Sequence, residues 1–186
     1  MHSQCLGQEV NMAETKLHNY SVQEKLNKMD IDLIDVTVEV DVGNVGAYTA
    51  GDVMFAVTEI PNAVPVNGGV ALLQSCSAII NGAADGTTTG AFDVIITSDS
   101  TTLSAAVNAA ASGNTDALAV MDGTCGFFSI TNAFDAGVVS LGDKKNIGMV
   151  CKAIAGSRSL YIWGIAQNAG DYIEGSIVFR LGFVKD

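Results

Sequence analysis

The chain has 186 residues, of which 48% are hydrophobic and 16% are charged. This composition excludes an intrinsically disordered chain, and a domain of this length buries roughly two-thirds of the surface that its unfolded form would expose. The sequence contains no run of about 18 uncharged apolar residues that would cross a bilayer, and its first residues lack the basic and apolar segments of a secretory signal. We therefore expect a soluble protein that assembles in the cytoplasm.

Charge is distributed unevenly along the chain. The formal net charge is −11, and residues 29 to 143 contain no Lys or Arg, whereas Asp and Glu recur throughout. Nucleic-acid binding requires clustered cations, and an acidic surface is repelled by anionic membranes. We expect neither nucleic acid nor membrane as a partner; such a surface instead suits a protein with a basic patch.

Residues 1 to 33 differ in composition from the rest and are predicted to form an N-terminal arm. The run Ser21-Val22-Gln23-Glu24 fits a capping box, which predicts a short helix over residues 22 to 29. A helix of that length is marginal alone, so we expect it to dock on the body or on a neighbouring subunit. The arm's candidate partner contacts are Leu17, Tyr20, Val22 and Leu26.

The remaining residues, 34 to 186, are predicted to form one β-domain. It opens with a strand in which valines at 36, 38, 40 and 42 alternate with polar residues, the pattern of a strand with one buried face. Further strands are expected at 52 to 60, where Pro61 ends the strand, at 70 to 80 and at 91 to 97. Asn67-Gly68 predicts a tight hairpin between two of them.

The second half of the domain is expected to begin with a long loop, 100 to 123, that holds one helical turn near 115 to 121 and packs over a sheet or onto a neighbour. Strands follow at 125 to 131, 147 to 155, 158 to 168 and 174 to 184, with a short one possible at 136 to 141. The last strand alternates poorly, as a central strand buried on both faces would. Lys144 and Lys145, in a predicted Gly-Asp turn, are either an anchor for an acidic partner or a solvated hairpin tip.

About eight or nine strands joined by Gly, Asn and Asp turns predict an all-β fold. The expected architecture is an antiparallel β-sandwich or a jelly-roll-like barrel, with an N-terminal arm and one short helix.

The residues that carry common chemistries are missing or misplaced. Both histidines, His2 and His18, lie in the arm, and no Cys or His pair has the spacing of a metal site. Phosphate-binding glycine loops are absent as well. We therefore predict no enzyme, no cofactor and no metal site.

Carboxylates leave one alternative open, because several aspartates lie in or beside turns and two of them could bind calcium or act as acid and base. The favoured interpretation is that they bond their own backbone. These residues are Asp85, Asp93, Asp99, Asp116 and Asp122.

Cysteines and aromatic residues are interpreted as packing residues. Cys76, Cys125 and Cys151 lie in apolar stretches and are expected in the core, although a disulfide is possible. Tyr161 and Trp163 would share one strand face, where core or inter-subunit packing is favoured over contact with a sugar.

Several turn and strand motifs resemble those of small virion proteins from tailed phages of aquatic bacteria. The resemblance covers about residues 45 to 185. The motifs are YTAGDVMF at 48 to 55, TEIPNAV at 58 to 64, NGG at 67 to 69, KNIG at 145 to 148, SLY at 159 to 161 and RLGF at 180 to 183.

The resemblance implies a cement protein that decorates and stabilises the capsid exterior by protein–protein contacts. Its expected partner is the major capsid protein, and we expect a homo-oligomer, for which a trimer is the working guess. Its expected location is the capsid surface of the virion after assembly in the host cytoplasm. The alternative is a tail-associated or receptor-binding virion protein, and a glycan-active enzyme ranks third.

Overall fold

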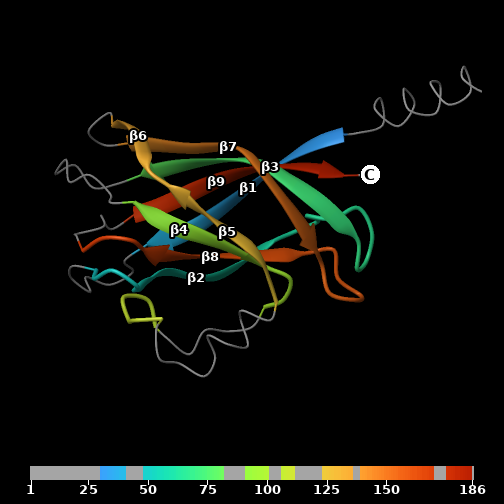
Figure 1. Cartoon of the computed structure of the whole chain (residues 1–186), viewed down its shortest axis with the longest axis horizontal. Helices are drawn as coiled ribbons and strands as arrows, with labels where there is room; N and C mark the ends of the chain where they lie inside the picture. Colours follow the sequence, from blue (N-terminus) through green and yellow to red (C-terminus); the bar gives the residue numbers. More distant parts are fainter. Residues whose placement is uncertain are drawn as a thin grey trace, which may run out of the picture. The chain divides into compact units, whose positions relative to one another are not determined.

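A computed structural model describes residues 30–40, 48–81, 91–100, 106–111, 123–135, 139–169 and 175–185. All of these except residue 30 fall in one compact unit, 31–185. The predicted helix, the arm contacts Leu17, Tyr20, Val22 and Leu26, and the helical turn near 115 to 121 lie outside the described residues. The elements of the described part are strands (Figure 1): β1 Asp30–Val40, β2 Val53–Ile60, β3 Val70–Asn81, β4 Phe92–Thr97, β5 Thr124–Ile130, β6 Asn132–Asp135, β7 Val139–Lys152, β8 Leu160–Ala166 and β9 Gly175–Lys185.

The strands form two antiparallel sheets. One has the order β1-β9-β3-β7-β6 and the other the order β2-β8-β4-β5. The all-β prediction is confirmed, and strands are present where they were expected near 52 to 60, 70 to 80, 91 to 97, 158 to 168 and 174 to 184.

Strand β1 has the one-sided burial that its valines predicted. Val36 and Val38 are buried, whereas Asp35 and Thr37, which alternate with them, are exposed. The strand begins at Asp30, earlier than the expected start at residue 34.

A common hydrophobic core links the two sheets in a sandwich-like arrangement. Phe179 of β9 is fully buried, and its ring centroid lies 5.5 Å from that of Phe55 on β2 and 6.2 Å from that of Phe92 on β4. Gly164 of β8 permits this packing, because a Cβ there would collide with the Phe55 ring. The core is therefore built from inward-facing aromatic residues of both sheets.

Strands β5 and β6 connect the sheets directly. Only Thr131 separates them, yet β5 pairs with β4 in the four-stranded sheet and β6 with β7 in the five-stranded sheet. Figure 1 shows the two running obliquely, one after the other. Of the short strand possible at 136 to 141, residues 139 to 141 belong to β7, and residues 136 to 138 lie outside the described residues.

The predicted turn at Lys144 and Lys145 is wrong. Both residues lie inside β7, which pairs with β3 along most of its length. Gly142 suggested a turn, but it lies within β7. A Cβ at this position would lie only 2.5 Å from the side chain of Ile130. The glycine is needed for close approach of the chain rather than for a reversal.

The predicted Asn67-Gly68 hairpin is also wrong, although the turn exists. The amide of Gly69 donates to the carbonyl of Val66 at 2.8 Å, and Gly68 has a φ of 68°. The turn joins β2 to β3, which belong to different sheets. A hairpin turn of type I′ needs positive φ at both central residues, a condition that Gly68 alone meets here.

Strand β9 occupies an inner position in its sheet but is not buried on both faces. Phe179, Leu181 and Phe183 point inward and are fully buried, whereas Arg180 is exposed. Gly182 made the alternation hard to recognise in the sequence. It lies on the outer face between Leu181 and Phe183, where a polar residue would have marked the exposed side of the strand.

Candidate interaction surfaces

The outer face of the five-stranded sheet carries an apolar patch made of Leu33, Leu72, Val150 and Val184. Leu72 of β3 is in register with Val184 of β9 on one side and with Val150 of β7 on the other. Leu33 of β1 lies beside Gly182, 3.6 Å from the position that a Cβ there would take. Leu33 is 65% exposed and Val150 is 64% exposed. We call these four residues the outer apolar patch.

A charged row crosses the same face next to this patch. The guanidinium of Arg180 donates two hydrogen bonds of 2.8 Å to the carboxylate of Asp35. Ser77 is in register with Arg180 and with Asp143, and Asp143 forms an ion pair of 3.0 Å with Lys145. The hydrogen bonds from Arg180 hold the pKa of Asp35 below its usual value. The face therefore combines apolar contact area with fixed charges.

Cations in the described strands are confined to the five-stranded sheet. They are Lys144, Lys145 and Lys152 on β7 and Arg180 and Lys185 on β9, whereas β2, β4, β5 and β8 have none. Lys144 and Lys145 are exposed. Their role as partner contacts stays a prediction.

The outer face of the four-stranded sheet carries a different apolar row. Phe127 of β5 and Trp163 of β8 are both in register with Ile95 of β4. Phe127 is 68% exposed, whereas Ile95 and Trp163 are 8% and 6% exposed. The prediction that packing would bury Trp163 is confirmed. Its indole Nε1 is buried and has no hydrogen-bond partner among the described residues.

Three polar side chains lie on the same face as Phe127, at the cross-strand pair two residues further along β5. We call Asp93, Ser129 and Gln167 the polar trio. Ser129 Oγ donates to the carboxylate of Asp93 at 2.7 Å, and Gln167 Nε2 donates to the same oxygen at 2.6 Å and to Ser129 Oγ at 2.9 Å. Asp93 and Ser129 are paired in register across β4 and β5. For Asp93 the expectation of a turn aspartate that bonds its own backbone is wrong, because this residue lies within β4.

Sequence reasoning missed Phe127, and of this trio it singled out only Asp93. A usable signal was present, since consecutive residues of a strand point to opposite faces and Phe127-Phe128 must therefore expose one ring unless both faces are covered. The trio could not be found in this way, because its members come from three distant parts of the chain.

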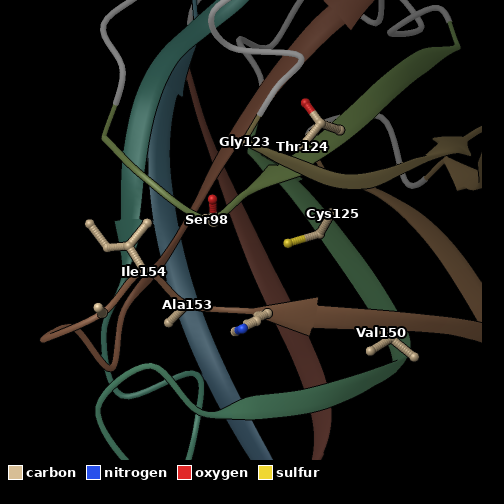
Figure 2. Close-up of a pocket in the computed structure, with 9 residues that line it drawn as sticks. Ser98, Gly123, Thr124, Cys125, Val150, Ala153 and Ile154 are labelled. Carbon is tan, nitrogen blue, oxygen red and sulfur yellow. The ribbon is translucent and has the colours of Figure 1, made fainter.

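A shallow depression lies where the end of β7 passes the start of β5. Figure 2 shows the Cys125 side chain directed into it, between Ser98 on one side and Val150 and Ala153 on the other. Cys76 and Cys151 are buried as expected, but Cys125 is half-buried. Sγ of Cys151 donates a hydrogen bond of 3.7 Å to the carbonyl of Met149, and the neighbouring thiols of Cys125 and Cys151 shift each other's pKa.

Within the described ranges, no three His, Cys, Asp or Glu side chains are grouped as a metal site would require. The same ranges include no helix with the length and apolar character needed to cross a bilayer. The chain matches no protein-family model and no curated protein sequence.

Proposed function

We propose that this protein is a structural component of a tailed bacteriophage that decorates the capsid exterior and stabilises the shell by protein–protein contacts. The outer apolar patch with its charged row carries the proposal. The resemblance of residues 45 to 185 to small phage virion proteins supplies the biological setting.

The strand order supports a jelly-roll architecture for the domain. Four neighbouring strands of one sheet have the order β1-β9-β3-β7, and the other sheet has the order β2-β8-β4-β5. Consecutive strands β1 to β4 thus alternate between the sheets and interleave with β7 to β9, as in double-sheet jelly rolls, an architecture that viral capsid and lectin domains share. Because one fold serves many functions, the strand order supports the architecture, and the function is argued from the surfaces of the domain.

The outer apolar patch has the character of a protein interface. Leu33 and Val150 expose most of their side-chain surface, and Leu72 and Val184 fill the sheet between them. Interfaces of stable complexes have an apolar centre and a polar rim. The Asp35–Arg180 pair and Lys145 supply that rim, and their fixed charges would set the orientation of a capsid protein on this face.

The arm and the oligomer belong to the same proposal. Leu17, Tyr20, Val22 and Leu26 would extend the contact onto a neighbouring subunit, and the copies would associate as a homo-oligomer, with a trimer as the working guess. Sedimentation analysis of the purified protein tests the oligomer, and a purely monomeric species at micromolar concentration would contradict it.

The capsid role is tested by adding the purified protein to capsids that lack it and measuring bound copies and heat resistance of the shell. We expect saturable binding, and we expect Val150→Asp to weaken it at least about tenfold, because a charge would enter the apolar centre. Phe127→Asp is the matched control, an equally exposed apolar residue on the other sheet, and should bind normally. Absence of binding by the unchanged protein would exclude the cement role.

A tail-associated or receptor-binding role is the second candidate, and the outer face of the four-stranded sheet favours it. An exposed ring, Phe127, stands next to the oxygen and nitrogen atoms of Asp93, Ser129 and Gln167. Aromatic faces beside such hydrogen-bonding groups suit a sugar. This reading predicts binding to host-surface glycans that Phe127→Ala abolishes and Val150→Asp leaves unchanged, together with few copies per virion rather than hundreds.

A further inference from the structure

We propose that Cys125 and Cys151 form a reversible disulfide that links the two sheets when the protein meets a small disulfide oxidant. The inference concerns a modification site and does not depend on the proposed function. Three features of the structure carry it: a bulge in β5, a close approach between β5 and β7, and the pairing of one accessible thiol with one buried thiol.

The bulge places Cys125 away from its own sheet ladder. Ile96 pairs with Gly126 and the next residue, Thr97, pairs with Thr124, so Cys125 is the extra residue between them. Bulges bend a strand and redirect the side chain at the irregular position. Cys125 is therefore free to face β7 of the other sheet instead of a neighbour in its own.

A side chain of β7 packs directly against the backbone of β5 at this point. A Cβ on Gly126 would lie 2.9 Å from Cε of Met149, so the glycine leaves room for a β7 side chain. Met149 and Cys151 lie two residues apart on β7 and share a face. Cys151 is fully buried and lies next to this contact. Cys125 also lines one depression with Val150 and Lys152, the two chain neighbours of Cys151, so the two thiols lie at the junction of the two sheets.

The two thiols have different chemistry. The neighbouring Cys151 thiol and, to a smaller extent, the backbone N–H of Lys152 lower the pKa of Cys125, although partial burial opposes the shift. The same pairing and burial raise the pKa of Cys151. Cys125 also lines the depression in Figure 2. It is consequently the thiol that ionises first and that an external reagent can reach.

Glutathione disulfide serves as the oxidant in a balanced exchange. The Cys125 thiolate attacks one of its sulfurs, which forms a mixed disulfide and releases one glutathione thiolate that takes up a proton. Cys151 then loses its proton and attacks Sγ of Cys125, and the second glutathione leaves as a thiol. Two protein thiols are oxidised, and one external disulfide is reduced to two thiols.

The test uses the full chain in which the fourth cysteine of the sequence is removed by Cys5→Ser, so that only Cys76, Cys125 and Cys151 can react. The protein is incubated with glutathione disulfide, and its thiols are then alkylated and mapped by mass spectrometry. We expect a peptide pair linked through Cys125 and Cys151, loss of two free thiols, and a melting temperature raised by roughly 5–10 °C that dithiothreitol reverses. Persistent glutathione on Cys125 without the internal link would overturn the proposal, as would an unmodified protein.

Cysteine variants distinguish formation of the Cys125–Cys151 disulfide from nonspecific oxidation of thiols. Cys151→Ser should stop at the mixed disulfide on Cys125, and Cys125→Ser should leave Cys151 unmodified because it is buried. Cys76→Ser is the matched control, since Cys76 is a buried free cysteine on β3, and it should form the link as the parent does. Equal thiol loss in the parent and in Cys125→Ser would show that the pair has no special role.

Discussion

Replacing Phe179 by alanine tests whether the two sheets share one core. The side chain is fully buried and contacts the rings of Phe55 and Phe92 from the opposite sheet. Truncation of a buried Phe to Ala costs about 3–5 kcal/mol, and each aromatic pair contributes about 0.5–1.5 kcal/mol beyond burial. We expect the free energy of unfolding to fall by roughly 4–5 kcal/mol and the melting temperature by roughly 10–20 °C.

The measurement is urea unfolding followed by the fluorescence of Trp163, the only tryptophan and a buried one. Phe127→Ala is the control, because the same atoms are removed from a side chain that is largely exposed, and its effect should stay within about 0.5 kcal/mol. If Phe179→Ala costs less than about 1 kcal/mol, or no more than the control, the two sheets do not depend on this contact.

Four further substitutions test other parts of the fold by the same unfolding measurement. Gly164→Ala should cost about 1–3 kcal/mol because the new methyl group meets an aromatic ring, whereas Gly126→Ala meets a flexible methionine and should cost less; the reverse order would contradict the packing. Asp52→Ala should cost roughly 1–3 kcal/mol, since a buried carboxylate there accepts hydrogen bonds of 2.7 and 2.8 Å, and an unchanged stability would refute this. Arg180 lowers the pKa of Asp35, so the stability it adds is present above the ordinary carboxyl pKa of about 4 and is lost as pH falls through the lowered value. Arg180→Gln should therefore be slightly less stable at pH 7 and equal to the parent near pH 2, and a difference that persists in acid would exclude the ion pair as its cause.

Alternation of side chains along the sequence predicted most of the strands. Val36 and Val38 predicted a one-sided strand, and the structure buries both. Such patterns succeed because burial on one face is a local property with a period of two residues. They do not reveal which strands pair, since pairing depends on contacts far apart in the chain.

The turn and hairpin predictions failed where glycine and asparagine occur for reasons other than reversal of the chain. Gly142 allows a close approach to Ile130, and Asn146 has a φ of 56° within β7, where it accompanies an irregularity rather than an end of the strand. Composition alone does not distinguish these uses, because turns, bulges and close contacts favour the same residue types.

The candidate surfaces were least accessible to sequence reasoning. Lys144 and Lys145 were found because they are adjacent, whereas the outer apolar patch joins residues of four strands that only the sheet order brings together. The contact between Cys125 and Cys151 requires a bulge in one strand and a glycine beside it, and neither has a recognisable signature.

The edge strands of the two sheets limit how copies of this protein can associate by strand addition. At the edges of the five-stranded sheet, β1 carries Asp32, Asp35 and Glu39, and β6 has only four residues. At the edges of the four-stranded sheet, residues 108 and 109 exchange backbone hydrogen bonds with Val53 of β2, and β5 has a bulge at Cys125. Charged, short, covered or bulged edge strands hinder strand addition from another molecule and so oppose amyloid-like growth. Such a chain can reach a high local concentration on a surface while neighbouring copies remain separate folded units.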